Sequence, residues 1–219
     1  MAERSGTKYL GKFGPQVSSF LGFSLLELLI VIAIVLIMAA VSIPMYLRIS
    51  HSFAIRSNAD AIMGLTTVAR MRAASNFARA EVVCDASSST CSIKVATFTG
   101  GKTDPSASDF VADLQAPQVV VLAKGVTFGA PSGASTGVGG QNSSAPYQGS
   151  SVGKCSYCAI FNSRGLPVGS SVVKGKPVSD YAFYLQDTQY NMAMAVGIDI
   201  SGKATVYRFD NNVWAKITN

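Results

Sequence analysis

Four cysteines carry the most evident chemistry in this chain of 219 residues. Cys84 and Cys91 enclose a six-residue segment, and Cys155 and Cys158 form a C-x-x-C pattern. An even number of cysteines is compatible with two disulfides and an oxidising compartment. We therefore treat all four as disulfide candidates. Three pairings are possible, and one of them consists of the two local bonds.

Two other functions of the cysteines are open. Four thiolates can bind zinc, and a C-x-x-C pattern can be a redox site, so the chain could be a membrane-anchored extracytoplasmic thiol-redox or zinc-binding protein. However, the first pair is not C-x-x-C, and no nearby histidine or helix-capping pattern would lower a thiol pKa. These features favour disulfides, and we expect no metal site.

The sequence offers no residue combination that other enzyme mechanisms require. His51 is the single histidine, which excludes mechanisms that need two imidazoles, and the acidic residues are scattered without an evident carboxylate pair. We therefore expect no catalytic residue and no cofactor. His51 lies close to Arg48 in the sequence, and we expect it at the membrane interface or at the surface.

A long apolar segment dominates the N-terminal part. The chain is 48% hydrophobic and only 14% charged, against a typical charged share of about 25%. The 20 residues of 28–47 carry no charge, and a helix of that length is about 30 Å long, enough to cross a bilayer. The alternatives are a cleavable secretory signal and a buried helix of a soluble core.

Basic residues before this segment predict its orientation. Arg4, Lys8 and Lys12 precede it, and positive charge is retained in the cytoplasm. The N-terminus is therefore expected in the cytoplasm, with the bulk of the chain outside it.

Glu27 stands next to the apolar segment. A carboxylate at membrane depth costs roughly 2.5 to 3.5 kcal/mol on insertion scales, and a plain membrane anchor gains nothing from it. A cation beside it would offset the cost, and a free α-amino group made by cutting the chain nearby would be such a cation.

The sequence Gly22-Phe23-Ser24-Leu25-Leu26-Glu27, followed by the apolar segment, resembles the type III signal of type IV prepilins and type II secretion pseudopilins. The resemblance implies that a prepilin peptidase cuts between Gly22 and Phe23 and N-methylates Phe23. It also implies that Glu27 serves assembly. Pro44 matches the family's helix-loosening proline, and a proline inside a helix removes a hydrogen bond and kinks it.

The same resemblance implies the partners and the location. The partners would be other pilins or pseudopilins, the prepilin peptidase, an inner-membrane assembly platform and membrane lipid. The precursor would be a single-pass inner-membrane protein. The mature subunit would then enter a periplasmic pseudopilus or a cell-surface pilus.

Beyond the apolar segment the pattern stays helical and then becomes strand-like. Apolar residues recur at helical steps through Ile55, Ile62, Leu65, Ala69, Ala73, Phe77 and Ala80. Strands are predicted at 93–98, 119–123, 126–128, 158–161, 181–185, 192–200, 204–209 and 213–217. Turn residues at 201–203 and 210–212 predict that the last three form an antiparallel meander. The expected fold is α+β, a long helix packed on antiparallel sheet.

Taken with the resemblance to prepilins, which implies the leader, the polymerisation helix and the pilin domain, these patterns divide the chain into four parts. They are a prepilin leader at 1–22, a transmembrane and polymerisation helix at 23–47, an amphipathic helix at 48–83 and an extracytoplasmic β-rich pilin domain at 84–219. Residues 129–154 include seven glycines and six serines and no charge before Lys154, so we expect a flexible exposed loop there. Asn142-Ser143-Ser144 within it also fits an N-glycosylation acceptor.

Short motifs beyond the apolar segment resemble a narrower group, the GspH/FimT-type minor pilins and pseudopilins. They are the helix motif at 67–80, Val82-Val83-Cys84 with Cys91, the segment 160–167 and the segment 196–204. This group usually has Arg where this chain has Lys203. The resemblance implies a minor pilin or H-type pseudopilin; a major pilin is the alternative within the family.

Basic residues near the C-terminus suggest an added function. Seven cations against four acids follow residue 153, namely Lys154, Arg164, Lys174, Lys176, Lys203, Arg208 and Lys216 against Asp180, Asp187, Asp199 and Asp210. Some minor pilins of this type bind DNA, and neutralisation of phosphates by such a face would be the mechanism. Solvated surface charge is the simpler interpretation.

Overall fold

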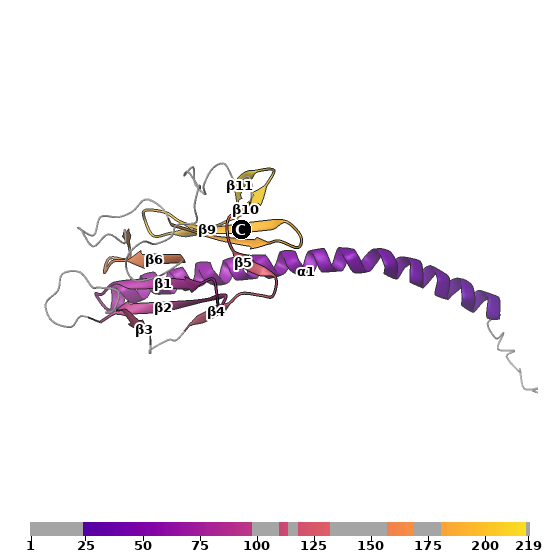
Figure 1. Cartoon of the computed structure of the whole chain (residues 1–219), viewed down its shortest axis with the longest axis horizontal. Coiled ribbons are helices and arrows are strands. Elements are labelled where there is room, and N and C mark those ends of the chain that lie inside the picture. Colours follow the sequence, from indigo (N-terminus) through magenta and orange to yellow (C-terminus); the bar gives the residue numbers. More distant parts are fainter. Residues whose placement is uncertain (1–23, 98–109, 114–117, 132–156, 169–180, 218–219) are drawn as a thin grey trace, which may run out of the picture. The chain divides into compact units, whose positions relative to one another are not determined.

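The computed structural model describes residues 24–97, 110–113, 118–131, 157–168 and 181–217. The chain divides into two compact units, Met1–Pro44 and Met45–Asn219. One helix, α1 (Leu25–Ser75), contributes its first turns to the first unit and its later turns to the second (Figure 1). The proposed leader at 1–22 lies outside the described residues, as do residues 132–154 of the Gly/Ser-rich segment.

The later turns of α1 have one buried face. Its buried apolar residues recur at steps of three, four or seven, which keeps them on one side of a helix; they are Ile55, Ala59, Ile62, Leu65, Ala69 and Ala73. Asn58 and Thr66 are buried among them. The amphipathic pattern of the sequence therefore identifies this face correctly up to Ala73.

The end of the helix differs from the sequence-based prediction. A helix to residue 83 was expected, but α1 ends at Ser75, and Phe77 takes a positive φ of 48° and is 82% exposed. The N–H of Ala78 donates to the carbonyl of Ala73 (3.2 Å), and that of Phe77 donates to the carbonyl of Ala74 (3.4 Å). These are the two bonds of a Schellman motif. Its left-handed position usually holds glycine, and a phenylalanine there gave no signal in the sequence.

The first sheet, sheet A, has six strands. They are β1 (Ala80–Asp85), β2 (Thr90–Ala96), β3 (Phe110–Ala112), β4 (Val119–Val121), β6 (Tyr157–Phe161) and β7 (Pro167–Val168). The order is β3-β2-β1-β6-β7, and β4 also pairs with β2. All pairs are antiparallel. The hairpin β1–β2 follows the helix directly.

The second sheet, sheet B, has five strands. They are β5 (Val126–Phe128), β8 (Tyr181–Asp187), β9 (Met192–Ile198), β10 (Ala204–Asp210) and β11 (Val213–Lys216). The order is β11-β10-β9-β8-β5, again antiparallel throughout. The predicted meander of the last three strands is confirmed. Asn211 and Asn212 both have positive φ, as a two-residue type I′ hairpin turn requires.

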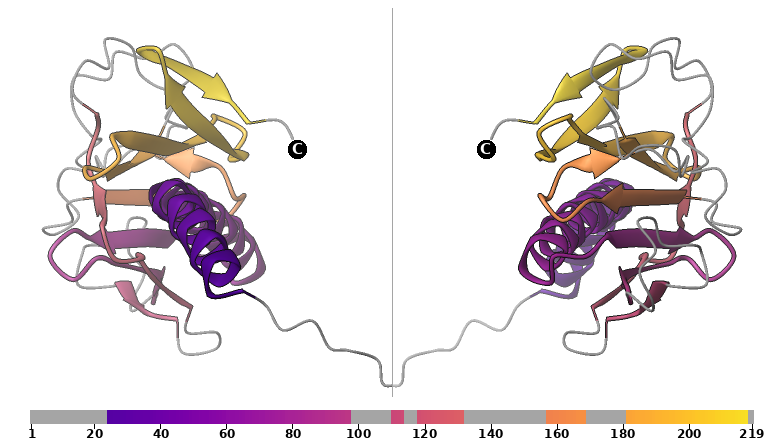
Figure 2. Two further views of the ribbon diagram at one scale, coloured as in Figure 1. Left: turned by 90° about the vertical axis from the view of Figure 1, so that its right-hand side faces the viewer. Right: turned by 90° about the vertical axis from the view of Figure 1, so that its left-hand side faces the viewer.

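The core of the second unit lies between α1 and both sheets. The buried face of α1 packs in one cluster with Val82, Ala159 and Phe161 of sheet A and with Phe183, Leu185 and Val196 of sheet B. Figure 2 shows strands from both sheets against these turns of α1. The fold is therefore α+β, a long helix packed on antiparallel sheets, as the sequence predicts.

Candidate assembly helix and surface sites

Glu27 lies in the first turn of α1. The N–H of Leu28 donates to the carbonyl of Ser24 at 3.1 Å, which closes the first turn of the helix. A helix N-terminus carries partial positive charge, so it favours a carboxylate there. Gly22 and Phe23, the proposed processing and methylation site, lie outside the described residues.

The apolar half of α1 is exposed. Its large apolar side chains from Leu25 to Ile49 are between 42% and 81% exposed. The helix contains one segment that is long and apolar enough to cross a membrane, and none of that segment is buried in the protein. These side chains therefore need a covering that this chain does not supply within the described residues. Pro44 lies inside the helix, in this exposed part.

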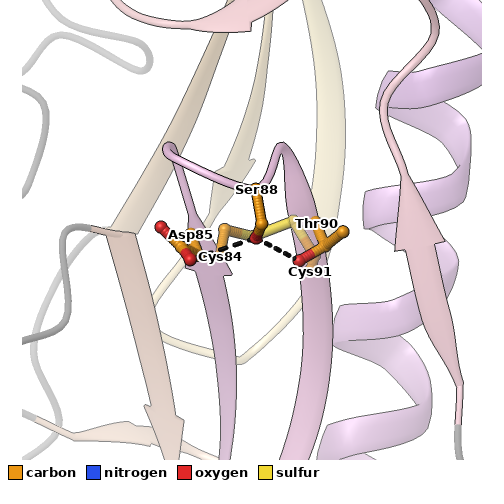
Figure 3. The surroundings of a disulfide bond; sticks show 5 residues. All are labelled: Cys84, Asp85, Ser88, Thr90 and Cys91. Carbon is orange, nitrogen blue, oxygen red and sulfur yellow. Dashed lines mark hydrogen bonds between the residues drawn. A yellow bond between two sulfur atoms is a disulfide. The ribbon is translucent and has the colours of Figure 1, made fainter.

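Cys84 and Cys91 form a disulfide across β1 and β2 (Figure 3). The two residues are direct partners in the strand register, with Cα atoms 4.0 Å apart, and both are buried. Closing so short a loop stabilises the folded chain by roughly 2 to 3 kcal/mol in the chain-entropy model. Cys158 is also disulfide-bonded, and Cys155 lies outside the described residues.

The faces of sheet A separate the cysteines. Cys84 and Cys91 belong to the core cluster beneath α1. Cys158 pairs in register with Val83, and its neighbour Ala159 belongs to that core cluster, so Cys158 points to the opposite face. A zinc site of four converging thiolates is therefore not favoured by this arrangement.

A hydrogen-bonded turn closes the disulfide hairpin. The carboxylate of Asp85 accepts hydrogen bonds from the N–H and the hydroxyl of Ser87. It also accepts one from the hydroxyl of Ser88, which bonds Thr90 as well (Figure 3). The hydrogen bonds from Ser87, and then those from Ser88, lower the pKa of Asp85. These hydrogen bonds therefore favour the ionised form of Asp85.

His51, expected at the membrane interface or at the surface, is half-buried and has side-chain partners that the sequence did not suggest. Its Nδ1 lies 2.6 Å from Oδ2 of Asp187, whose side chain is fully buried, and its ring lies 4.5 Å from that of Tyr190. The other oxygen of Asp187 accepts the N–H groups of Gln189 and Tyr190. These contacts attach α1 to the β8–β9 hairpin.

Two turns of the same design meet at Arg70. In each, a side-chain oxygen accepts two backbone N–H groups: Asn162 binds those of Arg164 and Leu166, and Asp199 binds those of Ser201 and Lys203. Gly165 and Gly202 occupy the same place in the two turns, with φ of 73° and 79°. The turns lie within the two motif segments, 160–167 and 196–204, that resemble the minor pilins.

The two glycines pack closely against Arg70 and each other. A Cβ on Gly165 would lie 2.9 Å from Cγ of Arg70, and one on Gly202 would lie 2.6 Å from the carbonyl oxygen of Gly165. The sequence analysis did not single out Arg70. The repeated Asn/Asp-x-x-Gly spacing indicates two similar turns, but it does not predict that the turns contact each other.

Glu81 is a second residue that the sequence analysis missed. It is 4% exposed on β1, pairs in register with Lys94, and its Oε2 has no hydrogen-bond partner among the described residues. Burial raises its pKa to about 7, although Lys94 acts in the opposite direction. A carboxyl group there takes up a proton near neutral pH.

The basic residues proposed for DNA binding are only partly described. Arg164, Lys203, Arg208 and Lys216 are exposed, whereas Lys154, Lys174 and Lys176 lie outside the described residues. Arg208 lies 3.8 Å from Asp210. Burial raises the pKa of Asp199, but hydrogen bonds from Ser201 and Lys203, with the charge of Lys203, lower it overall.

Comparisons with known proteins add one structural likeness. No family model and no curated protein matches the chain. A solved structure similar to it is the minor pseudopilin EpsH from the Type 2 Secretion System of Vibrio cholerae. The likeness has 9% sequence identity and a TM-score of 0.35, and it covers 75% of this chain and 96% of that one.

Proposed function

We propose that this chain is the precursor of a minor type IV pilin or an H-type pseudopilin, a structural subunit of a fibre and not an enzyme. The proposal rests on the position of the motif Gly22-Phe23-Ser24-Leu25-Leu26-Glu27 at the start of α1. This motif leads directly into a helix whose first half exposes its apolar side chains and whose second half enters the core of a β-rich domain.

The exposed half of α1 fits both the membrane-inserted precursor and the subunit in the fibre. In the precursor, lipid covers the apolar side chains, and the basic residues of the leader keep the N-terminus in the cytoplasm. In the fibre, the apolar helices of other pilins or pseudopilins replace the lipid. The prepilin peptidase and an inner-membrane assembly platform act between the two stages.

The zinc or thiol-redox function is the weaker alternative. It needs reduced cysteines that converge, whereas Cys84 and Cys91 are joined and Cys158 points to the other face of sheet A. Nothing in the arrangement of the described basic residues favours DNA binding as a second function.

Processing is the first prediction and the direct test. Co-expression with a prepilin peptidase should remove residues 1–22 and leave Phe23 with one added methyl group, as read by intact-mass and N-terminal peptide analysis. Gly22→Leu should block the cut, because the peptidase must accommodate the residue before the scissile bond, whereas Gly22→Ala is the milder control. An intact leader, or a cut after Ala39 or Ala40, would show that the segment is a plain anchor or a secretory signal.

A further inference from the structure

A groove in the second unit is not used by the proposed assembly helix. It has a volume of about 250 Å³ and lies between the exposed side of α1 and the ends of β10 and β11. Its lining consists of Asp60, Met63, Lys203, Ala204, Thr205, Val206, Lys216 and Ile217. Helix, turn and strand therefore all contribute to it.

The floor of the groove is apolar and firmly supported. Val206 is buried in the core cluster, and Met63, Ala204 and Ile217 pack against that cluster. The N–H of Ile217 donates to the carbonyl of Val206 at 3.0 Å, which holds Ile217 beside β10. An apolar side chain entering here would therefore meet a preformed surface and pay little ordering cost.

The rim is mostly positive. Lys203 follows the turn at Asp199, whose Oδ1 accepts its backbone N–H at 3.0 Å, and Lys216 lies on β11 opposite Tyr207. Within the part of the chain that the structure describes, neither lysine takes part in a salt bridge. Asp60 is the one acid of the lining, and Arg56 lies 3.9 Å from it. Lys203 and Lys216 thus stand beside an apolar floor, and the charge of Lys203 also acts on Asp199.

We propose that this groove binds an acidic peptide segment of a partner protein, in which carboxylates flank an apolar side chain. The carboxylates meet Lys203 and Lys216, and the apolar side chain meets Met63, Val206 and Ile217. Charge complementarity of this kind selects partners more than it adds affinity. A nucleic-acid backbone fits less well, because it has no apolar side chain to place on the floor formed by Met63, Val206 and Ile217, and that floor offers phosphates no hydrogen bond.

This function does not depend on the pilin proposal. It needs only the folded second unit, so an unprocessed or unassembled chain would bind the peptide as well. Failure of cleavage at Gly22 would therefore leave the groove proposal intact, and failure of peptide binding would leave the pilin proposal intact.

The test is a titration of the full chain in detergent micelles, followed by NMR of the methyl groups of Met63 and Ile217. The probe is the acetylated and amidated peptide Glu-Leu-Glu, with Gln-Leu-Gln and Glu-Ser-Glu as matched peptides. We expect saturable shifts of both methyl groups with Glu-Leu-Glu and at least about tenfold weaker binding of each matched peptide, a loss of about 1.4 kcal/mol.

Charge reversal separates recognition from folding. The double variant Lys203→Glu with Lys216→Glu should lose Glu-Leu-Glu binding and gain binding of Lys-Leu-Lys, a gain that a merely damaged fold would not produce. The control variant Lys124→Glu with Arg208→Glu changes the net charge equally at residues outside the groove lining, and it should still bind Glu-Leu-Glu.

Four results would overturn the proposal. They are the absence of Met63 and Ile217 shifts, equal shifts with Gln-Leu-Gln, tighter binding of an oligo-dT strand at the same methyl groups, and shifts that depend on protein concentration without peptide. The third would identify a nucleic-acid surface, and the fourth a contact between copies of this chain.

Discussion

At the residue scale, Glu27 has the clearest consequence for assembly. It lies in the first turn of an apolar helix, and the proposed cut would place a positive α-amino group on Phe23 nearby in sequence. Methylation of that amine keeps its charge. An unpaired charge in an apolar surrounding is costly, so we propose that the carboxylate of Glu27 pairs with this amine of a neighbouring subunit, and that the pair would fix the axial stagger between subunits.

The second prediction follows from this pairing. Glu27→Gln and Glu27→Ala should leave membrane insertion and cutting intact but reduce the number of subunits per fibre, measured by quantitative mass spectrometry of sheared fibres. Wild-type numbers of the Glu27→Ala protein would contradict the pairing role. Molecules must be counted, because a rare tip subunit recruited through its β domain would still be detected.

Glu81 gives a third prediction, about pH. Its folded pKa of about 7 exceeds the ordinary value of 4.5, so the folded chain binds the proton more tightly than the unfolded chain. The stability that this proton contributes is fully present below pH 4.5 and is lost as the pH rises through about 7. At about 1.4 kcal/mol per unit the loss is about 3 kcal/mol.

The measurement compares denaturant unfolding of wild type and Glu81→Gln between pH 4.5 and 8. The amide carries no charge at any pH, so the variant should gain stability relative to wild type across this window. Asp210→Asn, at an exposed acid, is the control and should show no comparable gain. A constant difference between wild type and Glu81→Gln would show that the carboxyl group stays ionised or finds a partner.

At the element scale, the two turns at Arg70 join α1 to both sheets. Glycine is needed at Gly202 for two reasons, its φ of 79° and the carbonyl oxygen of Gly165 at 2.6 Å from where a Cβ would stand. Backbone cannot move aside as a flexible side-chain end can. Gly64, by contrast, lies in α1 with open space around it.

The fourth prediction is therefore a pair of opposite effects. Gly202→Ala should lower the free energy of unfolding by about 2 kcal/mol or more, since left-handed backbone alone costs roughly 1 to 2 kcal/mol and the contact adds to it. Gly64→Ala should raise it by about 0.5 to 1 kcal/mol. Denaturant unfolding of both variants measures the difference. Equal effects would mean that the turns do not contribute to the stability of the fold.

The elements also show what sequence could and could not predict. Strands such as β5 and the β9–β10–β11 meander follow from local alternation and turn residues, and the inner face of α1 follows from its period. The helix end at Phe77, the short strands β3 and β7, and the pairing of β1 with both β2 and β6 depend on tertiary contacts. Local propensity carries no information about such contacts.

The same limit applies to the candidate sites. The motif Gly22–Glu27 could be proposed from sequence because its residues are consecutive, and it stays a prediction. Cys84 and Cys91 could be named as disulfide candidates, but the sequence left open which cysteines pair. His51 and Asp187 are 136 residues apart, and nothing in either local sequence points to the other. Arg70, Glu81 and the groove also arise only when distant segments pack together.

At the scale of the whole molecule, the two units need different surroundings. Among the described residues before His51, none is buried, whereas the core begins at Ile55. The apolar half of α1 therefore adds exposed apolar surface without adding core among the described residues. The remaining 48–219 should hold every interaction that folds the β-rich domain.

The fifth prediction is that a chain starting at Arg48 stays soluble without detergent and unfolds in one cooperative transition. Its free energy of unfolding should lie within about 1 kcal/mol of the full chain in micelles, because the described residues that the deletion removes, 24–47, are all exposed except the half-buried Ala39. A matched chain starting at Asp60 loses Ile55, Ala59 and the contact of His51 with Asp187. It should be less stable by at least about 2 to 5 kcal/mol, since losing one large buried side chain already costs that much.

Size-exclusion chromatography measures the solubility and denaturant unfolding the stability of the two shortened chains. Aggregation of the chain starting at Arg48, or equal stability of the two, would mean that the apolar half of α1 takes part in the core.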